Sequence, residues 1–206
     1  GLQNQSQLFV RQGLRGKPRL LLDPNAWAKD AATALDEWKP AVRGRYLLYS
    51  VQDGGTDWRI LRVLDVATGK VLQDEIRWAK FTELAWVGEE GFLYSRFPAP
   101  EQGRDFQALN YNQTLWFHRI GTPQSADELV YATPEQREYS PRAEVTADGR
   151  HAVITSSIGT DARYEVHVIN LARRATDGWK ARPIVTGFEH DWKLVEGMGN
   201  TLWFIT

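Results

Sequence analysis

The sequence contains no cysteine, which excludes disulfides, thiol nucleophiles and zinc–thiolate sites. It also lacks an excess of either charge, because 25 Lys and Arg residues face 26 Asp and Glu residues, for a net charge of -1. This balance gives no electrostatic basis for binding nucleic acid or an anionic membrane surface. No apolar run approaches the roughly 18–20 residues that span a bilayer. We therefore expect a soluble globular chain with no nucleic-acid or membrane partner, for which cytoplasm and periplasm both remain open.

The patterns of a self-contained catalytic site are missing as well. None of the seven serines lies in a G-x-S-x-G turn, and the four histidines (118, 151, 167 and 190) have no serine at an interpretable offset. No metal-binding spacing, acidic calcium loop or phosphate-binding glycine loop occurs. Adjacent acids such as Asp74 and Glu75 are interpreted as solvated surface charge. The sequence thus predicts no catalytic, cofactor-binding or metal-binding residue within this chain.

Short apolar segments bounded by turn residues dominate what is present, together with nine Trp, seven Tyr and eight Phe. These features favour strands. Each of four segments follows a Gly or Asn turn of the kind that joins hairpin strands. These segments recur at intervals of roughly 45–60 residues, the range of four-stranded propeller blades. They are 46–51, 92–94, 151–154 and 202–205.

Two further series of apolar segments follow the first, the earlier of them some 15–25 residues into each unit. One comprises 60–63, 115–118 and 166–169, and the other 71–72, 128–130 and 183–185. We therefore predict an all-β fold, a single incomplete β-propeller domain over residues 1–206. It would hold a partial blade at 1–25, full four-stranded blades at about 40–80, 81–133 and 141–187, and a partial blade at 190–206. An open arc of blades leaves apolar faces exposed, so we expect the segment alone to self-associate.

Two segments do not fit the strand pattern. Residues 26–39 carry a possible helical stripe, but we interpret them as irregular structure with at most one or two turns. Residues 98–113 are polar and aperiodic, and are interpreted as a surface loop. The chain begins without Met and without the basic and apolar regions of a signal peptide, so we expect it to be part of a longer polypeptide.

Several motifs occur in an order that resembles the propeller domain of prolyl oligopeptidases, serine peptidases that cut short peptides after proline. They are Leu22-Asp23-Pro24-Asn25, Gly55-Thr56-Asp57-Trp58-Arg59-Ile60, Ala67-Thr68-Gly69, Lys80-Phe81, Gly91-Phe92-Leu93-Tyr94-Ser95, His118-Arg119-Ile120-Gly121-Thr122 and Ala143-Glu144-Val145-Thr146-Ala147-Asp148-Gly149-Arg150. In that family a seven-bladed propeller covers an α/β-hydrolase domain that carries the Ser-Asp-His triad. The resemblance implies about half of such a propeller, with the catalytic domain absent from this chain.

The resemblance also implies site residues. Asp57 matches an acid in a charged network at the interface with the peptidase domain, where it helps to hold an arginine that binds the substrate backbone. Phe81 matches an aromatic that lines the pocket for the residue upstream of the substrate proline. The alternatives are a turn residue for Asp57 and plain blade core for Phe81. Ser157 stands where the family can carry a propeller arginine, and Thr160 and Ser140 stand where some members carry sulfur-bearing side chains.

The function implied by the resemblance is to gate and orient short proline-containing peptides for a serine oligopeptidase. The chain would be non-catalytic in isolation, its partner would be the α/β-hydrolase domain of the same polypeptide, and no cofactor is expected. Two alternatives remain. One is an independent propeller that binds a protein or serves as a scaffold without enzymatic activity, and the other is a dehydropeptidase-like relative with a different specificity.

Overall fold

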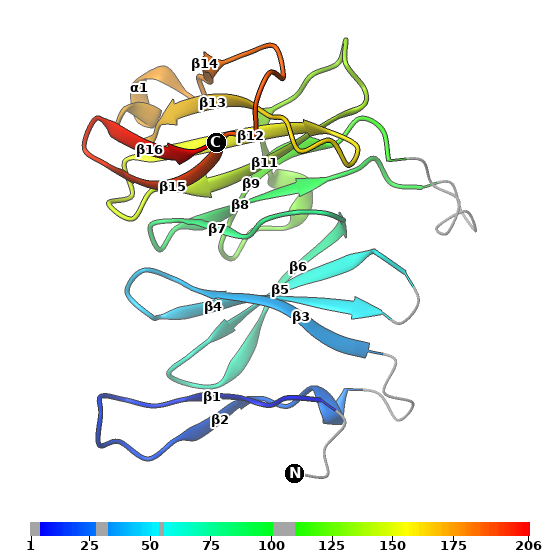
Figure 1. The fold of residues 1–206 in the computed structure, drawn as a ribbon. Helices are drawn as coiled ribbons and strands as arrows, with labels where there is room; N and C mark the ends of the chain where they lie inside the picture. Colours follow the sequence, from blue (N-terminus) through cyan, green and yellow to red (C-terminus); the bar gives the residue numbers. More distant parts are fainter. Residues whose placement is uncertain (1–4, 28–32, 54–55, 101–109) are drawn as a thin grey trace.

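The computed structural model describes residues 5–27, 33–53, 56–100 and 110–206. Over these residues the chain is built almost entirely of strands (Figure 1). The strands are β1 (Leu8–Val10), β2 (Arg19–Leu22), β3 (Thr33–Pro40), β4 (Tyr46–Asp53), β5 (Arg59–Asp65), β6 (Lys70–Ala79), β7 (Ala85–Val87), β8 (Gly91–Arg96), β9 (Thr114–Arg119), β10 (Glu128–Tyr131), β11 (Tyr139–Val145), β12 (His151–Ile158), β13 (Glu165–Asn170), β14 (Arg182–Val185), β15 (Lys193–Met198) and β16 (Thr201–Ile205). The helical elements are η1 (Pro24–Ala26), η2 (Gln124–Ala126), η3 (Leu171–Arg173) and α1 (Arg174–Asp177), and none of the described helices could cross a membrane.

The strands form antiparallel sheets from consecutive segments of the chain. β3 to β6 form one four-stranded unit and β7 to β10 another, and a single residue pair, Ala79 of β6 with Arg96 of β8, joins the two. β11 to β14 form a separate four-stranded sheet, and the pairs β1–β2 and β15–β16 stand at the two ends. Figure 1 shows these units stacked in chain order. The fold is therefore an open, partial β-propeller, which confirms the predicted fold class.

The hydrophobic core lies between successive units. One cluster, which includes Leu64, joins β1–β2 to the sheet of β3 to β6. A second, which includes Phe92, joins that sheet to β7 and β8, and a third, which includes Ile154, joins β7 to β10 to the sheet of β11 to β14. Packing is tight at Gly91, where an added Cβ would lie 2.1 Å from the carbonyl oxygen of His118. Each unit is thus held by its neighbours, as expected of stacked blades.

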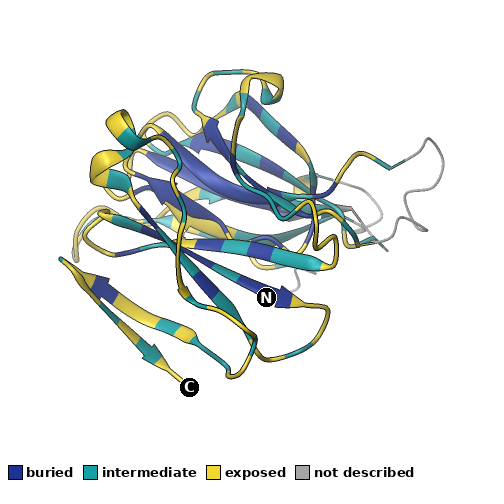
Figure 2. Ribbon diagram, turned by 90° about the horizontal axis from the view of Figure 1, so that it is seen from above, coloured by how far each residue is buried: buried dark blue, intermediate teal, exposed yellow. Residues whose placement is uncertain are grey.

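The last strand pair differs from the central units in its exposure. Four large apolar side chains on β15 and β16 are half exposed or more, and Figure 2 shows this exposed hairpin beside the buried central strands. They include Val195 at 63%, Met198 at 61%, Trp203 at 50% and Ile205 at 63%. On the opposite end pair, Phe9 of β1 is 52% exposed. Both end units therefore present apolar surface that a further blade would cover.

Within the segment 26–39, the expectation of irregular structure was wrong for residues 33–39, and residues 28–32 lie outside the described residues. Residues 33–40 form the strand β3, whereas we expected irregular structure up to about residue 40. The register of β3 shifts between Leu35 and Trp38. At this irregularity the buried hydroxyl of Ser50 accepts from the N–H of Glu37 (3.0 Å) and donates to Oδ2 of Asp36 (3.0 Å). The sequence did not predict this strand, because charged residues in the middle of β3 interrupt the apolar run from which strands are predicted. Most of the loop expected at 98–113, residues 101–109, lies outside the described residues.

Asp74 is also not the solvated surface charge that its sequence context suggested. It is 5% exposed, and its Oδ1 lies 3.0 Å from Nε2 of His118. The other ring nitrogen of His118, Nδ1, lies 2.7 Å from Oδ1 of Asp127, whose Oδ2 accepts from the hydroxyl of Tyr94 at 2.6 Å. Burial alone would lower the pKa of His118, but the two carboxylates outweigh it and raise that pKa to about 9. His118 is therefore a protonated link between β6, β9 and the β9–β10 turn.

Candidate functional site

Two aromatic residues at the end of β6 and in the connection from β6 to β7 lie in the left-handed region of backbone space. Trp78 has a φ of 65° and Phe81 a φ of 50°, where bulky residues are held at a cost of about 1–3 kcal/mol. The buried side chain of Gln113 fixes this connection, because its Nε2 donates to the carbonyl oxygens of Lys80 (2.9 Å) and Phe81 (3.3 Å). The N–H of Phe97 donates to the carbonyl of Trp78 (3.1 Å). Tertiary contacts thus impose a backbone that the local sequence disfavours.

Lys80 lies at the centre of this connection, with only 11% of its side chain exposed. Its Nζ is 3.5 Å from Oδ2 of Asp57, 5.2 Å from the ring centroid of Trp58 and 5.1 Å from that of Phe81. Both rings are within the distance of a cation–π contact. One lysine therefore brings together Asp57, from the β4–β5 connection, and Phe81, from the β6–β7 connection. We call these three residues the Lys80 cluster.

Two members of the Lys80 cluster remain open to solvent. Asp57 has 59% of its side chain exposed, and Phe81 is 40% exposed. Phe81 is therefore not a fully buried core side chain. The contact of Asp57 with Lys80 is long and involves Oδ2, so that the carboxylate has accessible oxygen for another donor. A guanidinium placed there would gain a bidentate, charge-assisted partner that a lysine cannot mimic.

The two remaining residues predicted for the site lie in another sheet. Ser157 is 5% exposed on β12 and pairs across the ladder with Ser140 of β11. Thr160 is exposed in the turn after β12, which the N–H of Asp161 closes by donating to the carbonyl of Ile158 (3.0 Å). The structure thus divides the predicted residues into the pair Asp57 and Phe81, in contact with Lys80, and the pair Ser157 and Thr160 on the sheet of β11 to β14.

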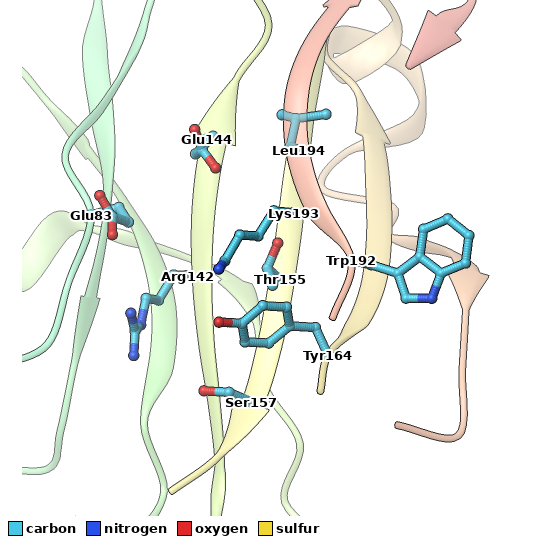
Figure 3. A pocket seen from close by; sticks show the side chains of 9 residues that line it. All are labelled: Glu83, Arg142, Glu144, Thr155, Ser157, Tyr164, Trp192, Lys193 and Leu194. Atoms are coloured by element: carbon cyan, nitrogen blue, oxygen red, sulfur yellow. The ribbon is translucent and has the colours of Figure 1, made fainter. Parts of the chain in front are cut away.

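A cavity of about 260 Å³ adjoins Ser157 (Figure 3). It lies between the sheet of β11 to β14 and β15, and Glu83 of the β6–β7 connection completes its wall. Its lining residues are Glu83, Arg142, Glu144, Thr155, Ser157, Tyr164, Trp192, Lys193 and Leu194. We call it the Arg142 cavity.

The sequence analysis missed Lys80, Gln113 and Arg142 as site residues. The motif Lys80-Phe81 was the available signal for Lys80, but the resemblance assigned a role only to its aromatic residue. Gln113 acts over a distance of more than thirty positions along the chain, and such a contact has no local signature.

His118 has both ring nitrogens engaged by carboxylates and no exposed surface, so it cannot serve as a base for a substrate. In the part of the chain that the structure describes, no group of three or more His, Cys, Asp or Glu side chains is placed to hold a metal ion.

Comparisons with known proteins agree with this description. The family pattern of the prolyl oligopeptidase N-terminal β-propeller domain matches residues 1–206. The prolyl endopeptidase of Elizabethkingia meningoseptica is 32% identical over 100% of this chain and 28% of its own length. A solved prolyl endopeptidase structure superposes with a TM-score of 0.87 at 48% identity, covering 99% of this chain and 28% of that one.

A second solved structure, prolyl oligopeptidase B of Galerina marginata bound to a 25mer macrocyclization substrate, superposes with a TM-score of 0.86 at 25% identity. It covers 99% of this chain and 31% of that one. The chain thus spans about 28% of the length of the curated prolyl endopeptidases that it matches in Elizabethkingia meningoseptica and Elizabethkingia miricola. The open stack of strand units and the full-length family match together show that this chain belongs to the prolyl oligopeptidase family, as its N-terminal β-propeller domain.

Proposed function

We propose that this chain is the gating and substrate-orienting propeller of a proline-specific serine oligopeptidase that hydrolyses short peptides after proline. In this proposal the chain is non-catalytic by itself. Its partners are the α/β-hydrolase domain of the same polypeptide and short proline-containing peptides. The family membership supports the parent activity. The observation that carries the role of the propeller is the Lys80 cluster, with an accessible carboxylate and an accessible ring on a rigid, strained connection.

The cluster suits substrate orientation for a physical reason. Residues that position a reacting group must be held rigidly, since small displacements are costly in rate. Phe81 is held by its own backbone conformation, by Gln113 and by the Lys80 cation. Asp57 is held near Lys80 and keeps most of its surface accessible. Phe81 can offer an apolar wall to a peptide side chain, and Asp57 can anchor an arginine of the peptidase domain.

The test uses the full-length protein that contains this chain, with a short quenched peptide cleaved after proline. For Phe81→Ala we expect KM to rise by about tenfold with kcat changed less, because the ring would contribute uniform binding. Leu129→Ala is the matched control, since Leu129 is a 50% exposed apolar residue on the outer strand β10, and its kinetics should equal those of the wild type.

Two outcomes would contradict the proposal. If the full-length protein hydrolyses no prolyl peptide, the chain belongs to a binding or scaffold propeller instead. If Phe81→Ala has the kinetics of the control, the ring lies outside the substrate path.

A further inference from the structure

The floor of the Arg142 cavity is one face of the β11–β12 ladder. Arg142 pairs with Thr155, and Ser140 pairs with Ser157. Because side chains alternate between faces along a strand, Arg142 and Ser157 stand on the same face as diagonal neighbours. The guanidinium of Arg142 is thus held beside the position where the family can carry an arginine.

Hydrogen-bond donors gather in one part of this cavity. Figure 3 shows the guanidinium of Arg142, the Nζ of Lys193 and the hydroxyls of Tyr164 and Ser157 directed toward a common region. The Nε of Arg142 is buried and has no hydrogen-bond partner among the described residues. A buried unpaired donor on a cation is costly. Lys193 contacts Asp191 (3.1 Å) yet is 61% exposed, so it can serve a further acceptor.

The acids of the cavity do not satisfy these donors. Figure 3 shows Glu83 and Glu144 above the guanidinium of Arg142, and among the described residues neither acid forms an ion pair with it. Burial raises the pKa of Glu144, the neighbouring charge of Glu83 raises it further, and the charge of Lys39 opposes this rise. The Nε of Arg142 therefore remains available to an acceptor from outside the described residues.

We propose that the Arg142 cavity binds the carboxylate of an acidic side chain of the peptide substrate, upstream of the scissile proline. The inference rests on the proposed function. Arg142 and Ser157 supply the central donors, with Tyr164 and Lys193 beside them. A singly charged carboxylate fits better than a phosphate, because Glu83 and Glu144 repel a second negative charge.

The position of the Arg142 cavity relative to Phe81 indicates that it would receive a substrate residue upstream of the scissile proline. Phe81 is proposed to contact the residue upstream of proline, and Glu83, two positions further along the same connection, enters the cavity wall. A peptide that passes Phe81 along the propeller therefore reaches the Arg142 cavity with a residue farther from the scissile bond. Arg142 is in this account a specificity-determining residue, and the hydrolytic chemistry does not depend on it.

The experiment compares the full-length peptidase with its Arg142→Met variant on paired quenched peptides. The two peptides of a pair differ only by Glu or Gln, at one of the second to fifth positions upstream of the scissile proline. We expect the wild type to prefer Glu at one position by about tenfold in kcat/KM. The Arg142→Met variant should lose that preference and hydrolyse the Gln peptide within about twofold of the wild-type rate.

Two further variants keep the result interpretable. Arg142→Lys retains the positive charge but loses the planar guanidinium, which can donate two parallel hydrogen bonds to a carboxylate. It should therefore retain part of the preference for Glu over Gln. Arg119→Met, which removes an exposed arginine from the far end of β9, should leave the preference intact. An Arg142→Met protein that does not fold leaves Arg142→Lys and the wild-type Glu-to-Gln ratio as the deciding measurements.

Each outcome decides the matter. Equal rates for Glu and Gln peptides at all four positions in the wild type overturn the inference, and so does a preference that survives in both Arg142 variants. In both of these cases prolyl hydrolysis itself still supports the proposed function. Failure to hydrolyse any peptide overturns the proposed function and the inference together.

Discussion

His118 and Lys80 are both cations held by carboxylates and rings, yet they lie at opposite ends of the same strands. Ala79, just before Lys80, pairs with Arg96 at the end of β8, whereas His118 pairs with Phe92 near its start. His118 is fully buried with carboxylates 2.7 and 3.0 Å away. Lys80 reaches one half-exposed carboxylate at 3.5 Å. The buried His118 network has both ring nitrogens paired with carboxylates, and it contributes to stability. The Lys80 cluster leaves a carboxylate and a ring exposed, and it keeps these groups available for a partner.

The largest loss of folding stability that we expect is in the His118→Leu variant. The substitution leaves the carboxylates of Asp74 and Asp127 buried without their cation, which costs about 3–5 kcal/mol. Amide hydrogen exchange of β8 and β9 in the full-length protein measures this loss locally.

His167→Leu is the control for His118→Leu. His167 is partly buried and burial lowers its pKa, so at neutral pH the substitution removes a neutral side chain and should cost about 1 kcal/mol. Equal losses for the two variants would show that the His118 network does not stabilise the fold.

The pH dependence of stability should report the same network. The pKa of His118 rises from 6.5 to about 9 on folding, so its contribution is complete below pH 6.5 and is lost as the pH rises through 9. The total is about 3 kcal/mol. Exchange protection of β8 and β9, corrected for intrinsic rates, should fall between pH 6.5 and 9.5 in the wild type. The same decline in His118→Leu would assign it to other groups.

A smaller effect is expected at the Lys80 end. Gln113→Leu removes the donor from the carbonyls of Lys80 and Phe81, at a cost of about 1–3 kcal/mol. Because it also releases the strained backbone of Phe81, KM for a prolyl peptide should rise. Gln136→Leu, at an exposed position, should change neither quantity. If Gln113→Leu loses stability but keeps the wild-type KM, the strained backbone of Phe81 does not contribute to substrate binding.

The sequence predicted most strands because their central positions are apolar. The second strand of each four-stranded unit (β4, β8 and β12) is marked by an uninterrupted apolar run and is mostly buried. The first strands of these units (β3, β7 and β11) are not so marked, since β3 and β11 carry charges and β7 has only three residues. Charged residues along an edge strand commonly prevent it from pairing with strands of other molecules. They also interrupt the apolar pattern from which a strand is predicted.

The candidate site could be predicted only in part. The resemblance to the family pointed to Asp57 and Phe81, and the structure places both against Lys80. The lysine itself was missed because its contacts join two connections, and local patterns do not encode such tertiary contacts. Arg142 was missed for a related reason: its significance depends on an unpaired Nε inside a cavity, and the sequence shows only an arginine in a strand.

The central claim is that the accessible carboxylate of Asp57 positions substrate, whereas the buried network of His118 only stabilises. The most direct test is kcat/KM of the full-length Asp57→Asn variant on a short prolyl peptide across pH. The side chain keeps its shape and loses one charge. We predict a loss of about tenfold and a shifted pH profile, with unchanged exchange protection. Wild-type kinetics and pH dependence in Asp57→Asn would contradict the account.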